Sequence, residues 1–216
     1  MKEIISQNLQ TDTLINAISI GIPGSVNNGK IYYIDGYETF EECELENELY
    51  NSFSIPVKII NNMNAIALGM AEKLACKEQN IACLHLAQTG PGCGAVVNGK
   101  AVSGFCGFNG EVGFIPFYER KTLQEVALSG FKDIHIGEFI GKIVICLTTI
   151  LNPRKIVLYI ELEEKDWESG MNNYCNQYLP KRVLPEFIIS NNYQEDYFYG
   201  LSFVGTELLF KRILNE

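Results

Sequence analysis

The sequence has few of the residues from which metal sites are built. It contains only two histidines, and no two of its seven cysteines are spaced as a Cys-x-x-Cys pair. Structural zinc sites normally combine cysteine and histidine at short, regular spacings. The sequence therefore predicts no metal site. An odd number of cysteines scattered over apolar segments predicts reduced thiols and a cytoplasmic protein.

Positive charge is also scarce, because 17 lysines and arginines face 26 acidic residues and leave a net charge of −9. Nucleic-acid binding requires a basic surface, so no nucleic-acid partner is expected. No apolar stretch follows Met1-Lys2-Glu3, which argues against a secretory signal. The longest apolar region, residues 134–151, carries Glu138 and Lys142 and is typical of a buried helix rather than a membrane span.

What the chain does contain is a regular succession of helical and extended patterns. Its 216 residues, 47% of them hydrophobic, are enough for one or two domains with a sizeable core. Strands that alternate with helices predict a layered α/β architecture. We expect helices over residues 1–14, 40–50, 62–76, 123–128, 139–151, 167–178 and 196–214, and strands over 17–22, 57–60, 81–87, 95–97, 101–102, 115–118, 156–160 and 186–190.

Two glycine-rich turns between residues 89 and 113 are the most informative feature of the chain. Glycine is favoured where the backbone needs a positive φ or where a ligand approaches it closely. The first turn, Thr89-Gly90-Pro91-Gly92-Cys93-Gly94, follows the apolar run 81–87. A strand that enters such a turn can cradle a phosphate with its backbone N–H groups. A tight hairpin turn explains the same pattern equally well, and both interpretations stay open.

The order of the motifs along the chain resembles that of the ROK family of repressors, open reading frames and sugar kinases. The resemblance covers nearly the whole chain and implies an actin-like, ribonuclease H-like α/β fold with two lobes and a cleft between them. Residues 1–60, with a C-terminal helix at about 200–216, would form the first lobe and residues 61–199 the second. The matching segments are Ile20–Val26, Ile55–Ala65, Thr89–Gly94, Asn98–Lys100 and Gly107–Gly113.

The resemblance also identifies candidate sugar-binding residues. In the family an aspartate deprotonates the sugar hydroxyl, and its position is occupied here by Asn62, whose amide cannot take up the proton. The positions of sugar contacts fall on Asn61, Asn62, Glu111 and Glu125. Three of these four have a simpler explanation: Asn61 as a helix N-cap, Glu111 as a solvated loop acid and Glu125 as an exposed helix acid.

On the nucleotide side, Thr89, Gly90, Gly92 and Gly94 match a phosphate-binding turn of the family. No cofactor follows from the residues alone, but the resemblance implies that ATP with Mg²⁺ could bind. Phe114 stands where the family has a histidine that contacts sugar and zinc, and the family's cysteine motif is replaced by a shorter segment without cysteine. Zinc is therefore not expected.

The resulting hypothesis is a sugar-kinase-like ROK protein, catalytically impaired, that binds carbohydrate or acts in regulation. One alternative is a glucokinase-like ATP-dependent sugar phosphotransferase, completed by another chain. A second is a fragment of a ROK-type transcriptional regulator, which the acidic charge disfavours. The family's opening Asp-x-Gly-Gly-Thr strands do not precede the first helix, so we expect an incomplete first lobe with an exposed sheet edge. Such an edge predicts a homo-oligomer or a partner chain that supplies the strands, beside a monosaccharide ligand and no membrane.

Overall fold

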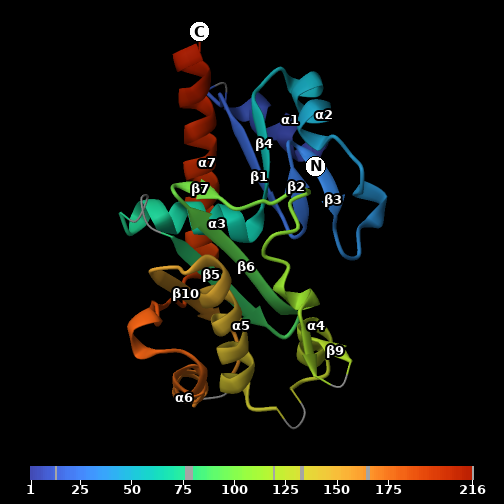
Figure 1. Cartoon of the computed structure of the whole chain (residues 1–216). Coiled ribbons are helices and arrows are strands. Elements are labelled where there is room, and N and C mark those ends of the chain that lie inside the picture. Colours follow the sequence, from blue (N-terminus) through green and yellow to red (C-terminus); the bar gives the residue numbers. More distant parts are fainter. Residues whose placement is uncertain (13, 76–79, 119, 132–133, 164–165, 216) are drawn as a thin grey trace.

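The computed structural model describes residues 1–12, 14–75, 80–118, 120–131, 134–163 and 166–215. It is a mixed α/β structure whose elements form an upper and a lower group in Figure 1. The helices are α1 (Lys2–Thr11), α2 (Leu45–Phe53), α3 (Asn62–Lys73), α4 (Leu123–Leu128), α5 (Ile136–Leu151), α6 (Trp167–Tyr178) and α7 (Tyr193–Asn215), with short 3-10 turns at Glu38–Phe40, Val112–Phe114 and Lys181–Val183.

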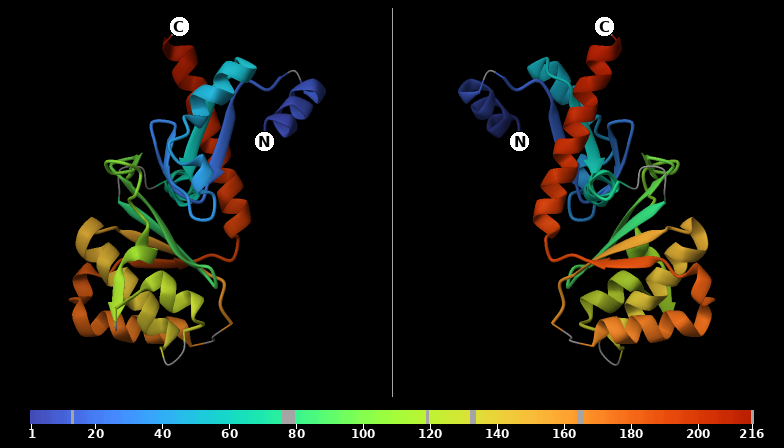
Figure 2. Two further views of the ribbon diagram at one scale, coloured as in Figure 1. Left: turned by 90° about the vertical axis from the view of Figure 1, so that its right-hand side faces the viewer. Right: turned by 90° about the vertical axis from the view of Figure 1, so that its left-hand side faces the viewer.

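The upper group is built on a parallel pair of strands, β1 (Ile18–Ile22) and β4 (Val57–Asn61). A hairpin of β2 (Ser25–Asn27) and β3 (Lys30–Tyr33) lies beside them. Residues of β4 alternate between buried and half-buried, which is the pattern of a strand with one face on a core. That core includes Ile31, Leu49 and Ile59. Helix α1 has no buried residue, and it stands apart from the sheet in both views of Figure 2.

The lower group is a five-stranded mixed sheet with the order β11-β10-β5-β6-β7. Its strands are β5 (Ile81–Ala87), β6 (Gly90–Val97), β7 (Lys100–Ala101), β10 (Lys155–Ile160) and β11 (Glu186–Ile189); β8 (Pro116–Tyr118) and β9 (Lys121–Thr122) form a separate small hairpin. One hydrophobic core joins β5, β6 and β10 to α4, α5 and α6. A second core packs α3 against the opposite face of the same strands. Burial on both faces explains why β5 and β10 are apolar almost throughout.

Helix α7 links the two groups. It packs on α3, β1 and β4, and in Figure 1 it runs as one continuous helix from the sheet past the upper strands. It crosses α3 at two glycines, since a Cβ placed on Gly200 would lie 2.2 Å from the carbonyl oxygen of Ala65, and one on Gly69 would lie 2.6 Å from the Gly200 Cα. The division of the chain into lobes at residue 60 and near residue 200 stays a prediction.

Most predicted elements are confirmed, and the errors lie chiefly at their ends; the strand expected over 95–97, for example, begins at Gly90. The helices over 123–128 and 167–178 have the expected bounds. The helix expected over 40–50 begins only at Leu45, because Glu42 has a φ of 66° that interrupts the helical backbone. The helix expected from residue 139 begins at Ile136, where the His135 ring accepts a hydrogen bond from Gly137 N–H at 3.0 Å. Histidine is not one of the residues that commonly cap a helix N-terminus, so the sequence does not mark this start.

Two further expectations concern the cysteines and the apolar helices. The six cysteines in the described part of the chain form no disulfide, while Cys76 lies outside the described residues. None of the described helices combines the length and apolarity that crossing a bilayer requires.

Candidate functional site

A polar cavity of about 180 Å³ lies where the β4–α3 junction, the β5–β6 turn and the loop before β8 meet. Six of the eight candidate residues line it. These are Asn61, Asn62, Thr89, Gly90, Gly92 and Glu111. The cavity is also lined by His85 and Gln124, which sequence reasoning did not select, and by Pro23, Gly24, Met63, Pro91, Cys93 and Gly110.

Asn61 holds the junction between β4 and α3 together. It is the N-cap of α3, and its Oδ1 accepts a hydrogen bond from Asn64 N–H at 3.0 Å. Its Nδ2 donates to the carbonyl oxygen of Gly24 at 3.0 Å. The side chain is buried, so these two bonds satisfy polar atoms that water does not reach. Of the two interpretations left open by the sequence, the structure confirms the helix cap; a sugar contact from Asn61 stays a prediction.

Asn62 begins a row of polar side chains, of which Asn62 itself and His85 line the cavity. Its Oδ1 accepts a hydrogen bond from Met63 N–H at 2.9 Å, and its Nδ2 donates to the Tyr193 hydroxyl at 3.3 Å. The Tyr193 ring is stacked on the His85 ring with 4.1 Å between centroids. His85 Nε2 in turn lies 3.2 Å from a carboxylate oxygen of Glu161. The row fixes the Asn62 amide, which can orient a ligand hydroxyl but cannot remove its proton.

His85 could not be selected from the sequence because it stands inside the apolar run 81–87, where a polar residue normally indicates only an edge of the core. The parallel pairing of β10 with β5 places Tyr159 opposite His85, and Glu161 follows Tyr159 two residues later in the sequence. The stacking partner Tyr193 comes from α7, more than 100 residues away in sequence. Long-range pairing of this kind leaves no local pattern in the sequence.

Glu111 is the acidic group of the cavity. Its side chain is half-buried, and this burial raises the pKa of its carboxyl above the usual 4.5. Within the described part of the chain, no hydrogen bond or ion pair reaches the carboxylate. Carboxylate oxygens only accept hydrogen bonds when ionised, so Glu111 offers acceptors to a ligand that donates hydroxyl protons.

We expect Glu111→Gln to raise the free energy of unfolding of the ligand-free protein at pH 7. Burial disfavours the ionised form in the folded protein, so wild-type stability falls as pH rises from about 4.5 through the raised pKa of Glu111. The neutral amide has no such penalty. The stability gap between variant and wild type should therefore open above pH 4.5 and close below it. Urea unfolding at pH 4, 5.5 and 7 measures this, and a constant gap would contradict it.

The predicted phosphate turn is a paired strand in the structure. Gly90 to Gly94 lie in β6, opposite Ala87 to Cys83 of β5, and Gln88 and Thr89 form the two-residue turn. Gly90 has a φ of 117°, which glycine alone adopts easily. The Gln124 side chain donates a hydrogen bond to the Thr89 carbonyl oxygen. The hairpin interpretation is thereby confirmed, and phosphate binding by this turn stays a prediction.

Gly94 does not line the cavity but allows α3 to approach β6. A Cβ at this position would lie 2.1 Å from the carbonyl oxygen of Met63, at the first turn of α3. Any side chain would push the helix, and with it Asn61 and Asn62, away from the strand. The requirement for glycine at residue 94 is therefore a packing requirement.

Glu125 is the other candidate outside the cavity. It closes a capping box at the start of α4, where Thr122 N–H donates to its carboxylate at 2.7 Å and its own N–H donates to the Thr122 hydroxyl at 3.2 Å. These bonds fix the helix start. The side chain is exposed, and its neighbour Gln124 lines the cavity instead. A sugar contact from Glu125 stays a prediction.

Phe114 and the residues around it bear on the question of metal. Phenylalanine has no ligand atom, and the described residues contain no group of three or more His, Cys, Asp or Glu side chains able to hold an ion. The donor set that zinc requires is thus not assembled in this part of the chain. The expected zinc-free state stays a prediction.

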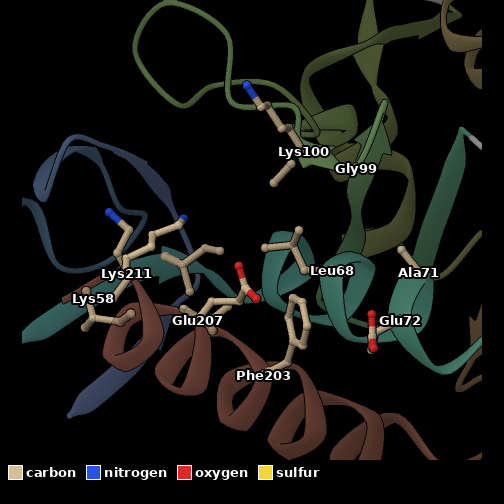
Figure 3. A pocket seen from close by; sticks show the side chains of 13 residues that line it. Lys58, Leu68, Ala71, Glu72, Gly99, Lys100, Phe203, Glu207 and Lys211 are labelled. Atoms are coloured by element: carbon tan, nitrogen blue, oxygen red, sulfur yellow. The ribbon is translucent and has the colours of Figure 1, made fainter. Parts of the chain in front are cut away.

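A larger cavity, of about 410 Å³, lies on another side of the molecule and contains none of the candidate residues. Figure 3 shows it between α3 and α7, with Leu68 and Phe203 facing its centre and Lys58, Lys100 and Lys211 around it. Lys58 is paired with Glu46 at 2.9 Å. Size alone does not select a functional site, and the smaller cavity is the one that combines a partly buried acid with fixed amide groups.

Comparison with known proteins identifies the family of this chain. The model of the ROK family matches residues 1–127. The xylose repressor of Bacillus spizizenii is 29% identical over 96 residues, which are 44% of this chain and 25% of the repressor. The chain spans less than half the length of the curated relatives that it matches.

Solved structures show the same fold. ROK hexokinase from Thermus thermophilus superposes with a TM-score of 0.75 at 17% identity, covering 97% of this chain and 85% of the hexokinase. A ROK family protein from Streptococcus pneumoniae, solved with sucrose, gives 0.73 at 18% identity, covering 99% and 86%. The expected α/β fold of the actin-like ATPases is confirmed, and by the match over its first 127 residues this chain belongs to the ROK family.

Proposed function

We propose that this chain is a carbohydrate-binding ROK protein with little or no sugar kinase activity, acting in regulation rather than in metabolism. The observation that carries the proposal is that Glu111 and Asn62 line one cavity: Glu111 is a partly buried acid with no hydrogen-bond or ion-pair partner among the described residues, and Asn62 has an oriented amide. Sugar hydroxyl groups both donate and accept hydrogen bonds, so they match a cavity lined by a carboxylate and an amide.

The proposed lack of activity follows from the chemistry of Asn62. Transfer of a phosphoryl group to a hydroxyl needs a base for the hydroxyl proton, and removing a general base typically lowers the rate by about 10²–10⁴-fold. The Asn62 amide is also engaged with the Tyr193 hydroxyl, which keeps it in place as a hydrogen-bonding group. Asn61 is committed to capping α3, so the other amide of the pair contributes chiefly rigidity.

Related proteins support carbohydrate as the ligand class. The Streptococcus pneumoniae ROK protein was solved with sucrose, and the Streptomyces griseus ROK glucokinase with glucose and AMPPNP. The matched Bacillus proteins are named xylose repressors. A regulatory role agrees with these repressors and with Asn62, whose amide cannot act as a general base.

We expect weak binding, millimolar at best, of a monosaccharide or a sucrose-like disaccharide, and its loss in Glu111→Ala. A lost hydrogen bond to a charged group costs about 1.5–3 kcal/mol, or roughly 10- to 150-fold in affinity. Ligand-observed NMR with xylose, glucose, N-acetylmannosamine and sucrose measures this. Glu168→Ala is the matched control, because it removes an exposed acid on α6 that is neither a candidate contact nor part of the cavity. Binding that survives Glu111→Ala would place the site elsewhere.

A coupled ADP-release assay on the same panel distinguishes the alternative, an ATP-dependent sugar phosphotransferase. What favours this alternative is that Thr89, Gly90 and Gly92 line the same cavity as Asn62. We expect no turnover above the blank, and none in Asn62→Asp. Turnover of about 1 s⁻¹ by the wild type, within the normal range of enzymes, would establish the phosphotransferase instead.

A further inference from the structure

Three aromatic side chains pack together beside the loop that carries Glu111. Tyr33 comes from β3, while Phe108 and Phe114 come from the loop that carries Glu111. The ring centroids of Tyr33 lie 6.0 Å from Phe108 and 5.6 Å from Phe114, and the two phenylalanines lie 5.1 Å apart. The rings therefore form one continuous cluster, with edge-to-face and tilted contacts typical of aromatic groups.

Phe108 and Phe114 flank Glu111 in the sequence, and backbone hydrogen bonds join both of them to it. Glu111 N–H donates to the Phe108 carbonyl oxygen at 3.3 Å, and Phe114 N–H donates to the Glu111 carbonyl oxygen at 3.2 Å. Burial raises the pKa of the Tyr33 hydroxyl, and the nearby charges of Asp35 and Glu111 raise it further. Gly24, which lines the cavity, packs against the Tyr33 backbone. Two residues that line the cavity, Glu111 and Gly24, thus adjoin residues of the cluster.

The rings are not sealed in a core. Phe114 is 50% exposed and Phe108 is 40% exposed, and Phe105 on the same loop is 95% exposed without belonging to the cluster. Adjoining aromatic rings that remain open to solvent beside a polar cavity commonly mark a place where a ligand is bound. A ligand that matches both the polar cavity and the aromatic cluster carries hydroxyl groups at one end and an apolar group at the other.

We propose that the Tyr33–Phe108–Phe114 cluster is a second subsite that binds the apolar aglycone of a glycoside, while the sugar ring occupies the cavity at Glu111. The inference rests on the proposed carbohydrate-binding function and narrows it from free sugars to glycosides. An aryl aglycone that stacks on these rings should gain binding free energy as aromatic pairs in proteins do. We therefore expect it to raise the affinity about tenfold, or about 1.4 kcal/mol.

The test compares methyl with 4-nitrophenyl β-D-glycosides of xylose and glucose by calorimetry. The wild type should bind the nitrophenyl member of at least one pair about tenfold more tightly. Phe114→Ala and Phe108→Ala should each remove most of this gain and leave the affinity for the methyl glycoside within twofold. Phe105→Ala is the matched control and should keep the gain, because it removes an exposed ring outside the cluster.

Three results would overturn the inference alone. The methyl glycosides could bind in a Glu111-dependent way with no gain from the aryl group, or the gain could survive both ring substitutions. Phe114→Ala could also weaken both members of a pair equally, which would assign the rings to holding β3 against the loop. If no glycoside and no free sugar binds, the proposed function fails and this inference fails with it.

Discussion

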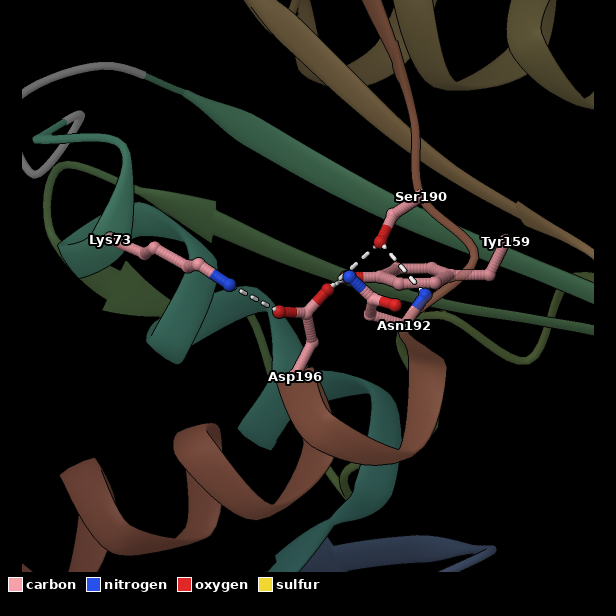
Figure 4. Close-up of polar contacts among 5 residues, drawn as sticks. All are labelled: Lys73, Tyr159, Ser190, Asn192 and Asp196. Carbon is pink, nitrogen blue, oxygen red and sulfur yellow. Dashed lines mark hydrogen bonds and ion pairs between the residues drawn. The ribbon is translucent and has the colours of Figure 1, made fainter.

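Asp196→Ala is expected to lower the free energy of unfolding by about 2–4 kcal/mol. Asp196 is 2% exposed and lies near the start of α7. Figure 4 shows its carboxylate accepting hydrogen bonds from three side chains: Lys73 Nζ at 2.9 Å, the Tyr159 hydroxyl at 3.0 Å and the Ser190 hydroxyl at 3.0 Å. These partners come from α3, from β10 and from the segment before α7, so one carboxylate joins three parts of the fold.

The expected loss of stability depends on the side chains that lose the Asp196 carboxylate as their partner. Breaking a fully buried ion pair costs about 3–5 kcal/mol, but Lys73 is 45% exposed and regains water, which lowers the expected loss. Tyr159 is fully buried and its hydroxyl would lose its acceptor, at a cost of about 1–3 kcal/mol. Asp196→Asn keeps the shape but removes the charge and should fall between alanine and wild type.

Urea unfolding measures the loss as a lower midpoint at unchanged slope. Glu195→Ala is the control, because it removes the neighbouring, exposed acid from the same helix turn and should change stability by no more than about 0.5 kcal/mol. A similarly small change for Asp196→Ala would mean that the network contributes nothing to the attachment of α7.

Gly200→Ala is expected to destabilise the protein by about 1–3 kcal/mol. The new Cβ would lie 2.2 Å from the Ala65 carbonyl oxygen of α3, a rigid backbone atom that cannot turn aside. The two helices must separate, and overpacking of this kind costs about that much. Because α3 begins at Asn62, we also expect weaker sugar binding in this variant.

Gly205→Ala provides the matched control on the same helix. The nearest atoms to a Cβ there are the Ser19 Oγ at 3.4 Å and Cβ at 3.7 Å, which are ordinary contacts. Alanine is favoured over glycine within helices by up to about 1 kcal/mol, so Gly205→Ala should be neutral or stabilising. Equal midpoints for the two variants in thermal and urea unfolding would contradict a close crossing at Gly200.

The sequence by itself determined which segments are strands and helices wherever the apolar pattern is strong. The runs 81–87 and 156–160 are buried strands because both of their faces meet helices, and such strands are recognisable as continuous apolar runs. The order of the motifs predicted the ROK resemblance and the actin-like fold. The resemblance also predicted that Asn61, Asn62, Glu111 and Glu125 would converge on one cleft; the first three line the same cavity, whereas Glu125 does not.

Only the tertiary structure decided what those residues do locally. Asn61 has both polar atoms occupied by backbone groups, one of them on Gly24 far away in sequence, so its role as a cap depended on how β4 meets the β1–β2 turn. Gln124 rather than Glu125 faces the cavity, because the capping box fixes the direction in which the first turn of α4 points. A shift of one residue on a helix rotates a side chain by about 100°, which no motif match resolves.

The same holds for the groups that surround the site. His85, Tyr193 and Glu161 meet only because β10 pairs with β5 and α7 returns across the end of the sheet. The aromatic cluster likewise joins Tyr33 to a loop more than 70 residues later. Local propensity and spacing act over a few residues, whereas these contacts are set by strand pairing and helix packing between distant segments. The chain's sequence thus determined the elements and their family, and the packing of those elements decided which side chains share the cavity.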